Sequence, residues 1–164
     1  MEEKKYKIFF LGDTNVGKSS ILKRFIYDSF TEIYLPSIGV DYKSKNVRIE
    51  DGNITLLLYD TTGLEKFRSL IPMYIRDANI FIFVYDIFCK ESFINLENWL
   101  NISKEKINLN ETINFLIGNK KDLSEKREIS IEEGKNLLKF MDLYLEKLVL
   151  KQKLDFMNFF IKIY

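Results

Sequence analysis

The chain has 164 residues, of which 46% are apolar and 30% charged, as expected of one globular domain with a full hydrophobic core. Its 25 lysines and arginines nearly balance its 24 aspartates and glutamates, so no bulk charge points to nucleic acid or to an anionic membrane. The chain has no histidine and one cysteine, Cys89, which excludes an internal disulfide and the commonest general base.

Targeting signals are missing from the sequence. The apolar runs are too short to span a bilayer, and the start Met1-Glu2-Glu3 fits neither a secretory signal nor a glycine-based myristoylation site. A single cysteine also fits a reducing compartment. We therefore expect a cytoplasmic protein, a monomer, with no nucleic-acid partner.

Apolar patterning predicts strands and helices that alternate along the chain. In chain order, it predicts a strand at 6–11, a helix at 18–27, strands at 40–49 and 54–59, a strand at 80–85, a helix at 91–105, a strand at 113–117 and a helix at 130–141. The strands at 40–49 and 54–59 flank a turn sequence, EDGN, and are predicted to form a hairpin. This order predicts a doubly wound α/β fold, in which ligands bind at the carboxyl ends of the strands.

A glycine-rich segment lies between the first predicted strand and the first predicted helix. Its sequence, GDTNVGKS, fits the phosphate-loop pattern G-x-x-x-x-G-K-[ST]. The glycines let backbone N–H groups converge on phosphate oxygens, Lys18 is expected to bridge the β and γ phosphates, and Ser19 to ligate Mg²⁺. The predicted nucleotide contacts of this segment are Gly12, Asp13, Thr14, Asn15, Val16, Gly17, Lys18, Ser19 and Ser20.

Asp60 and Gly63 follow the strand predicted at 54–59. A carboxylate at Asp60 is suited to hold Mg²⁺ through a water, and Gly63 is suited to present its N–H to the γ-phosphate, because that approach leaves no room for a side chain. Asp and Gly are also ordinary turn residues, so the pair gains meaning only from its place after a second strand downstream of a phosphate loop.

The segment Asn119-Lys120-Lys121-Asp122 follows the strand predicted at 113–117. A carboxylate at Asp122 can accept two hydrogen bonds from guanine, whereas adenine offers neither donor on that edge. The stem of Lys120 can lie over the base plane, and Asn119 can tie this loop to the phosphate loop. In isolation the four residues also fit a polar turn before a helix. The three motifs in this order on alternating elements therefore predict a guanine-nucleotide site.

These motifs resemble those of the Ras superfamily of small GTP-binding proteins over roughly Lys4 to Lys135. The segments IGVDY, LYDTTGLEKFRSL and YDIFCKESF resemble the Rab branch, and LIPMYIRDA and KREISIEEG resemble its Golgi-associated subgroup. The resemblance implies a three-layer P-loop fold with a mostly parallel central sheet and one antiparallel hairpin strand. It places the core motifs of the small GTPase domain at 1–135 and makes 136–164 an atypical tail of the same domain.

The resemblance also implies a function and a set of partners. The expected function is a GTP/GDP switch in vesicle traffic that uses Mg²⁺ and meets effector, exchange and GTPase-activating proteins through 31–45 and 60–77. By the same resemblance Phe30 stacks on the guanine edge, Tyr34 covers the phosphates and Ser37 takes the place of a metal-ligating threonine. The implied metal ligands are thus Ser19, Ser37 and Asp60. A Golgi or endomembrane surface is expected on this basis alone.

One departure from the family concerns catalysis, which the resemblance assigns to Lys18, Ser37, Gly63 and position 64. Leu64 stands where the family has a glutamine that orients the attacking water, and Thr62 replaces a small alanine. We expect Leu64 to be a non-functional replacement, so that GTP is held and hydrolysed slowly. The alternatives are that Glu65 or Tyr34 aligns the water, or that the chain recruits effectors with little or no turnover.

The other departures lie at the end of the chain. The family continues with a strand, a Ser-Ala-Lys turn that touches the base, and a closing helix, whereas 136–164 contains no Ser-Ala pair and repeats leucines at helical spacing. We predict a helical tail in place of the strand, with lower guanine affinity. The strand at 113–117 then becomes an edge, and the sheet face beside it is either exposed or covered by the folded-back tail. A truncated or misread product explains the same features.

The end of the chain also contains no cysteine that could be prenylated, and Cys89 is internal, so we expect no membrane anchor in this chain.

Overall fold

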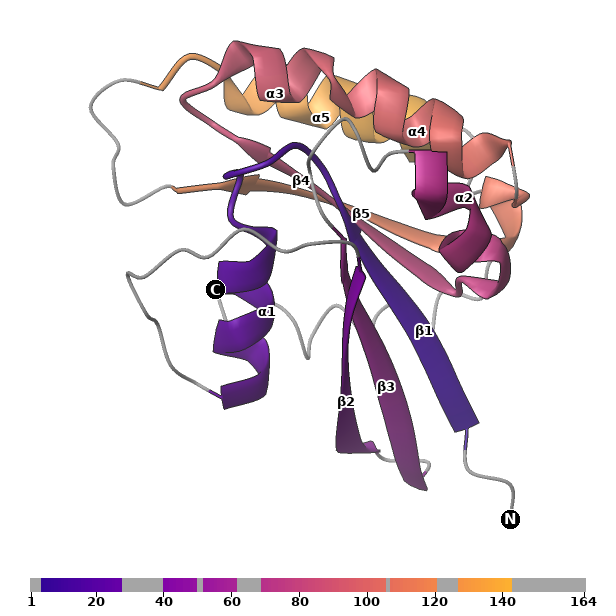
Figure 1. The fold of residues 1–164 in the computed structure, drawn as a ribbon. Coiled ribbons are helices and arrows are strands. Elements are labelled where there is room, and N and C mark those ends of the chain that lie inside the picture. The colour runs from indigo at the N-terminus through magenta and orange to yellow at the C-terminus, as the bar shows by residue number, and fades with distance from the viewer. Residues whose placement is uncertain are drawn as a thin grey trace.

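Five strands form one mixed sheet in the order β2-β3-β1-β4-β5 (Figure 1). The computed structural model describes residues 4–27, 40–49, 52–61, 69–105, 107–120 and 127–142. The strands are β1 (Lys4–Leu11), β2 (Val40–Ile49), β3 (Gly52–Thr61), β4 (Ile80–Asp86) and β5 (Ile113–Asn119). β1 pairs in parallel with β3 and β4, β4 pairs in parallel with β5, and β2 pairs antiparallel with β3. The predicted mostly parallel sheet with one hairpin strand is confirmed.

Helices lie on both faces of this sheet. They are α1 (Lys18–Tyr27), α2 (Ile71–Tyr74), α3 (Lys90–Ile94), α4 (Leu96–Lys104) and α5 (Ile131–Asp142), with 3₁₀ turns η2 (Ile75–Asp77) and η3 (Leu109–Glu111). Figure 1 shows α1 on one face and α3, α4 and α5 on the other. The helix predicted at 91–105 is divided at Asn95, which ends α3 and precedes α4. None of the helices in the described ranges has the length and apolar character needed to cross a membrane.

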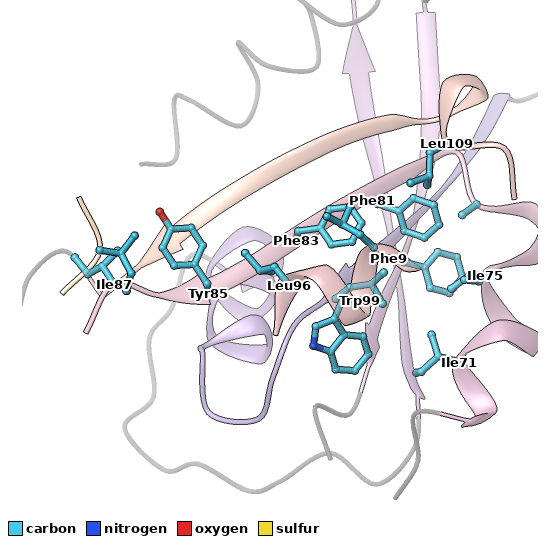
Figure 2. Packing of buried hydrophobic residues seen from close by; sticks show 14 residues of the cluster. Phe9, Ile71, Ile75, Phe81, Phe83, Tyr85, Ile87, Leu96, Trp99 and Leu109 are labelled. Atoms are coloured by element: carbon cyan, nitrogen blue, oxygen red, sulfur yellow. The ribbon is translucent and has the colours of Figure 1, made fainter. Parts of the chain in front are cut away.

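Side chains of β1 and β4 alternate between the two faces, because successive residues of a strand point in opposite directions. Phe9 and Phe81 belong to the core under α4, whereas Ile8 and Ile82 belong to the core under α1. Figure 2 shows the first of these cores, where Trp99 of α4 lies among the side chains of the sheet and of the α2 region. Both central strands are therefore buried on two sides, which explains their continuous apolar runs.

β5 is the last strand of the described sheet and pairs there with β4. Ile80, Ile82 and Val84 of β4 are buried on the α1 side. Their neighbours on β5 are partly buried. α5 agrees with the helix predicted at 130–141. The remainder of the predicted helical tail lies outside the described residues.

Candidate nucleotide-binding site

The predicted motifs meet at one edge of the sheet. β1, β3, β4 and β5 run parallel, so their carboxyl ends share that edge. Gly12 follows β1, Asp60 lies at the end of β3 and opposite Phe10 of β1, and Asn119 ends β5 opposite Asp86 of β4. The fold therefore brings the phosphate loop, Asp60 and the start of the predicted base loop together.

The phosphate loop turns sharply between β1 and α1. Gly12 and Gly17 have φ values of 146° and 99°, and Asn15 has a φ of 61°, all in the region that side chains disfavour. A Cβ on Gly12 would lie 2.1 Å from the carbonyl oxygen of Val84, so the loop rests directly on the end of β4. This close approach requires glycine. The loop leads into α1, whose first-turn N–H groups form a site for anions.

Lys18 is held at the phosphate loop by the loop's own backbone. Its side chain is 5% exposed, and Nζ donates hydrogen bonds to the carbonyl oxygens of Gly12 at 2.8 Å and Asp13 at 2.6 Å. Val16, in the middle of the loop, is buried in the core under α1. The ammonium group therefore lies at the loop itself, where it is suited to meet phosphate oxygens.

The side chain of Asp13 is turned away from the loop and toward α4. Its two carboxylate oxygens accept hydrogen bonds from Asn95 Nδ2 at 2.7 Å and from Trp99 Nε1 at 2.9 Å. The side chain of Asp13, a predicted nucleotide contact, thus contacts the α4 region, and a nucleotide contact through its backbone stays a prediction. The sequence signal for this contact is weak: an asparagine and a tryptophan four residues apart lie on one side of a helix.

The described candidates for a metal site are Ser19 and Asp60. Asp60 is 4% exposed at the end of β3, and this end is fixed to β1 because Thr61 Oγ1 donates a hydrogen bond to the Phe10 carbonyl at 2.6 Å. A hydroxyl and a carboxylate are hard oxygen donors, which fit Mg²⁺. Within the described ranges, no three cysteine, aspartate or glutamate side chains cluster in a way that would hold a metal. Of the described residues, Ser19 and Asp60 could thus hold Mg²⁺, and Ser37, the third predicted ligand, lies outside them.

The loop after β5 is joined directly to the phosphate loop. Asn119 Nδ2 donates a hydrogen bond to the carbonyl oxygen of Val16 at 2.8 Å, which is the tie we expected. A Cβ on Gly17 would lie 2.1 Å from the same Nδ2 atom, so Asn119 occupies the space above this glycine. The two loops therefore form one structural unit at the edge of the sheet.

Lys120 forms an ion pair with Asp86 that the sequence did not predict. Its Nζ lies 2.7 Å from Asp86 Oδ2, and the two side chains are 27% and 15% exposed. The backbone N–H of Phe88 donates to Asp86 Oδ1 at 3.0 Å, and the backbone N–H of Asp86 donates to Ser92 Oγ at 3.0 Å. The carboxylate is thus fixed at the end of β4, and the ammonium group of Lys120 is held beside it.

The segment that precedes α5 is anchored on the loop after β4. The backbone N–H groups of Glu128 and Ile129 donate to the Ile87 carbonyl at 3.0 and 3.2 Å, and Ile129 is fully buried. Ser130 and Glu133 then form a capping box: the Ser130 N–H and hydroxyl donate to the Glu133 carboxylate, and the Glu133 N–H donates to the Ser130 hydroxyl. These hydrogen bonds, with the nearby Lys90, lower the pKa of Glu133.

Tyr85 lies beneath this region and is buried between the sheet and α5. A Cβ added to Gly118 or to Gly134 would lie 2.7 or 2.9 Å from its hydroxyl oxygen. Burial raises the pKa of the phenol, Arg127 opposes this rise and Glu133 adds to it. The neutral phenol therefore serves as a packing element between β4, β5 and α5.

Several predicted site residues lie outside the described residues and stay predictions. They are Phe30, Tyr34, Ser37, Thr62, Gly63, Leu64 and Asp122.

The fold and the described half of the site define a P-loop nucleotide-binding protein: a strand, a glycine-rich loop that holds a lysine, and a helix, with an asparagine loop joined to them. The family model of the Ras family matches residues 7–164, and the chain belongs to this family of small GTPases, which act as molecular switches. The matched region includes 136–164, where the sequence departs from the expected motifs.

Proposed function

We propose that this chain is a GTP/GDP switch of the Rab branch, which binds Mg²⁺, acts in vesicle traffic at a Golgi or other endomembrane surface, and hydrolyses GTP slowly. The observation that carries the nucleotide site is the 2.8 Å hydrogen bond from Asn119 to Val16, which joins the base loop to a phosphate loop with Lys18 in place. The segments IGVDY, LYDTTGLEKFRSL and YDIFCKESF support the Rab branch.

The roles of the site residues follow from their chemistry. Lys18 and the backbone N–H groups of the loop bind the β and γ phosphates, and Asp122 accepts the two hydrogen bonds that distinguish guanine. Ser19, Ser37 and Asp60 hold Mg²⁺, which neutralises charge on the phosphate oxygens. Asn119 keeps the base loop and the phosphate loop at a fixed separation, so that one nucleotide spans both.

Slow hydrolysis follows from the side chain at position 64. Leu64 cannot donate or accept a hydrogen bond, so it cannot orient an attacking water. The loss of one positioned polar group at a transition state costs ~2.7–4 kcal/mol, roughly a hundredfold or more in rate. Nucleotide affinity does not depend on this group, because its partner is the water. The GTP-bound state is therefore long-lived.

Exposed apolar side chains in both predicted partner-binding segments support the proposed effector contacts. Tyr42 of β2 is 49% exposed, Met73 and Tyr74 of α2 are 75% and 50% exposed, and Leu70 is 42% exposed. These residues fall in the segments 31–45 and 60–77 that we assign to partner binding. Tyr42 also packs against Tyr59 with ring centroids 5.2 Å apart, which gives the exposed ring a fixed support. Large exposed apolar side chains of this kind are common in protein interfaces.

The alternative function is a GTP-binding module that recruits effectors with no useful turnover. Leu64 and Thr62 favour this alternative, whereas the intact phosphate loop and the buried Asp60 favour a working switch. A truncated or misread product is the third explanation for the departures in 136–164. The three differ in what the purified chain carries.

A two-part experiment tests the proposal. In the first part, nucleotide is extracted from freshly purified protein: GDP indicates turnover, GTP indicates a stalled switch with little or no turnover, and no bound nucleotide indicates a failed fold or a degenerate product. In the second part, labelled GDP and GTP are titrated with Mg²⁺ onto nucleotide-free protein. We expect saturable binding that ATP does not displace and that inosine nucleotides displace weakly, because they lack the amine that Asp122 recognises. Equal displacement by ATP would overturn the proposed base recognition.

A further inference from the structure

We propose that Asp13 is a positioning residue for the phosphate loop: Asn95 and Trp99 hold its carboxylate against α4, and this anchor fixes the carbonyl groups that hold Lys18 at the phosphate site. The inference rests on the proposed function, since it takes the loop to bind a nucleotide. It assigns to Asp13 a structural link that phosphate-loop chemistry does not require, because any residue at this position supplies the same backbone N–H.

The anchor side of this link is rigid. Trp99 is fully buried in the core between α4 and the sheet, and its indole N–H reaches out of that core to Asp13 Oδ1 at 2.9 Å (Figure 2 shows the ring in its packing). Asn95, one turn earlier at the junction of α3 and α4, donates to Asp13 Oδ2 at 2.7 Å. Two donors, one at the junction of α3 and α4 and one on α4, therefore fix both oxygens of one carboxylate, and hydrogen bonds to a charged acceptor are stronger than neutral ones.

The other side of the link reaches the phosphate-binding lysine. The carbonyl oxygen of Asp13 accepts a hydrogen bond from Lys18 Nζ at 2.6 Å, and the neighbouring carbonyl of Gly12 accepts a second at 2.8 Å. Asp13 is thus bonded to α4 through its side chain and to Lys18 through its backbone. A displacement of this residue moves one of the two oxygens that locate the ammonium group.

The same contacts explain how a carboxylate is tolerated beside a site for anions. An aspartate that faced the phosphates would repel them, because like charges at short range in a partly buried site interact strongly. The hydrogen bonds from Asn95 and Trp99 satisfy the carboxylate on the far side of the loop. The negative charge therefore strengthens the anchor and is held away from the ligand.

Replacement of Asp13 by alanine and by asparagine tests the proposal. Asp13→Ala removes both hydrogen bonds, and we expect GDP and GTP to bind about tenfold or more weakly. Asp13→Asn keeps both: its Oδ1 accepts from Trp99, and its amide N–H donates to Asn95 after a flip of the Asn95 amide. We therefore expect Asp13→Asn to bind GDP and GTP nearly as tightly as wild type does. If Asp13 acted only through its negative charge, the affinity of Asp13→Asn for these nucleotides would differ from that of wild type.

A double-mutant cycle identifies the partner. Trp99→Phe keeps an aromatic ring but removes the indole N–H, so its effect on nucleotide affinity should largely disappear in the Asp13→Ala background. Ser103→Ala is the matched control: Ser103 is buried on α4, and its hydroxyl donates to the Trp99 carbonyl. This control lowers the melting temperature through α4 without loosening Asp13, so its nucleotide affinity should stay at the wild-type value.

The outcomes separate this inference from the proposed function. Absence of guanine-nucleotide binding by the wild-type chain overturns the proposed function itself. Normal binding by wild type and by Asp13→Ala overturns only the anchor, as does Asp13→Asn binding as weakly as Asp13→Ala. Affinity losses that add in the Asp13→Ala, Trp99→Phe double variant show that the two residues act separately, and this result also contradicts the proposal.

Discussion

Asn119 Nδ2 lies 2.8 Å from the carbonyl oxygen of Val16 and donates a hydrogen bond to it. The two residues come from loops that follow different strands, and they are 103 positions apart in the chain. A nucleotide that contacts both loops depends on this separation. The bond therefore couples base binding to phosphate binding.

Replacement of Asn119 by alanine should weaken the binding of GDP and GTP and lower the melting temperature. The substitution leaves the Val16 carbonyl without this donor, and an unsatisfied buried polar group costs about 1–3 kcal/mol. Isothermal titration and thermal unfolding measure the two effects. Asn101→Ala, at an exposed position on α4, is the matched control and should change neither. Wild-type affinity in the Asn119→Ala variant would contradict the coupling of the loops.

Replacement of Gly17 by alanine should displace Asn119 and weaken nucleotide binding. The added Cβ would lie 2.1 Å from Asn119 Nδ2, and the φ of 99° at Gly17 strains any side chain. Gly52→Ala separates these causes, because Gly52 has a φ of 127° but nothing within 4 Å of its added Cβ. Gly52→Ala should lower the stability of the fold without changing nucleotide affinity, whereas Gly17→Ala should lower both. Wild-type affinity in the Gly17→Ala variant would show that the contact between position 17 and Asn119 does not govern nucleotide binding.

Replacement of Asp86 by asparagine should weaken guanine-nucleotide binding by loosening Lys120. The pair is only partly exposed, and Asp86 is fixed by the Phe88 N–H, so the ion pair restricts the lysine before ligand binds. We expect non-additive losses of affinity for Asp86→Asn and Lys120→Met in a double-mutant cycle. Asp77→Asn breaks a more exposed pair with Lys7 at 3.1 Å and should change nothing measurable. Additive losses would show that Asp86 does not act through Lys120.

Replacement of Leu64 by glutamine should speed single-turnover GTP hydrolysis by about a hundredfold or more and leave GTP affinity unchanged. The amide side chain restores a group that can orient water. Leu64→Met, which adds no hydrogen-bonding group of comparable strength, should hydrolyse GTP at the wild-type rate. If wild type already matches the Leu64→Gln rate, a neighbour such as Glu65 or Tyr34 aligns the water instead.

Stability should fall at acidic pH because of Glu133. Its hydrogen bonds to Ser130 lower its pKa in the folded state below the ordinary value of 4.5. The carboxylate therefore stabilises the fold fully above that ordinary value, and this stabilisation disappears as the pH falls through the lower, folded pKa. The free energies of unfolding of wild type and Glu133→Gln, measured in urea, should differ at neutral pH and become equal at acidic pH. Glu132→Gln, at an exposed neighbouring position, is the control and should have the unfolding free energy of wild type at neutral and at acidic pH.

The strands were predictable because their apolar runs are long and continuous, but their ends were not. β3 begins at Gly52 and extends to Thr61, beyond the predicted 54–59, because the ladder with β2 continues through polar residues. β4 and β5 likewise extend to Asp86 and Asn119. Backbone hydrogen bonds extend the strands beyond their apolar runs, and the hydrophobicity of the side chains does not indicate this extension. Asp60, Asp86 and Asn119, at the carboxyl ends of β3, β4 and β5, belong to the candidate site.

The phosphate loop was predictable from spacing, whereas its supports were not. Glycines and a lysine at fixed intervals predict a turn that binds anions. The contacts of Asp13 with Trp99 and of Lys120 with Asp86 join residues whose distance in the sequence gives no hint of proximity. Such pairs depend on how helices pack on the sheet. A single sequence contains no direct signal for that packing.

Gly12 rests on the carbonyl of Val84, and this contact has a consequence for how the chain folds. The loop acquires its shape only after β1 has paired with β4, and these strands are brought together across a long intervening stretch of chain. Non-local pairing of this kind is slow, because the entropy of closing the long loop is lost before the contacts form. Refolding should therefore show ligand capture as a late event that follows assembly of the sheet.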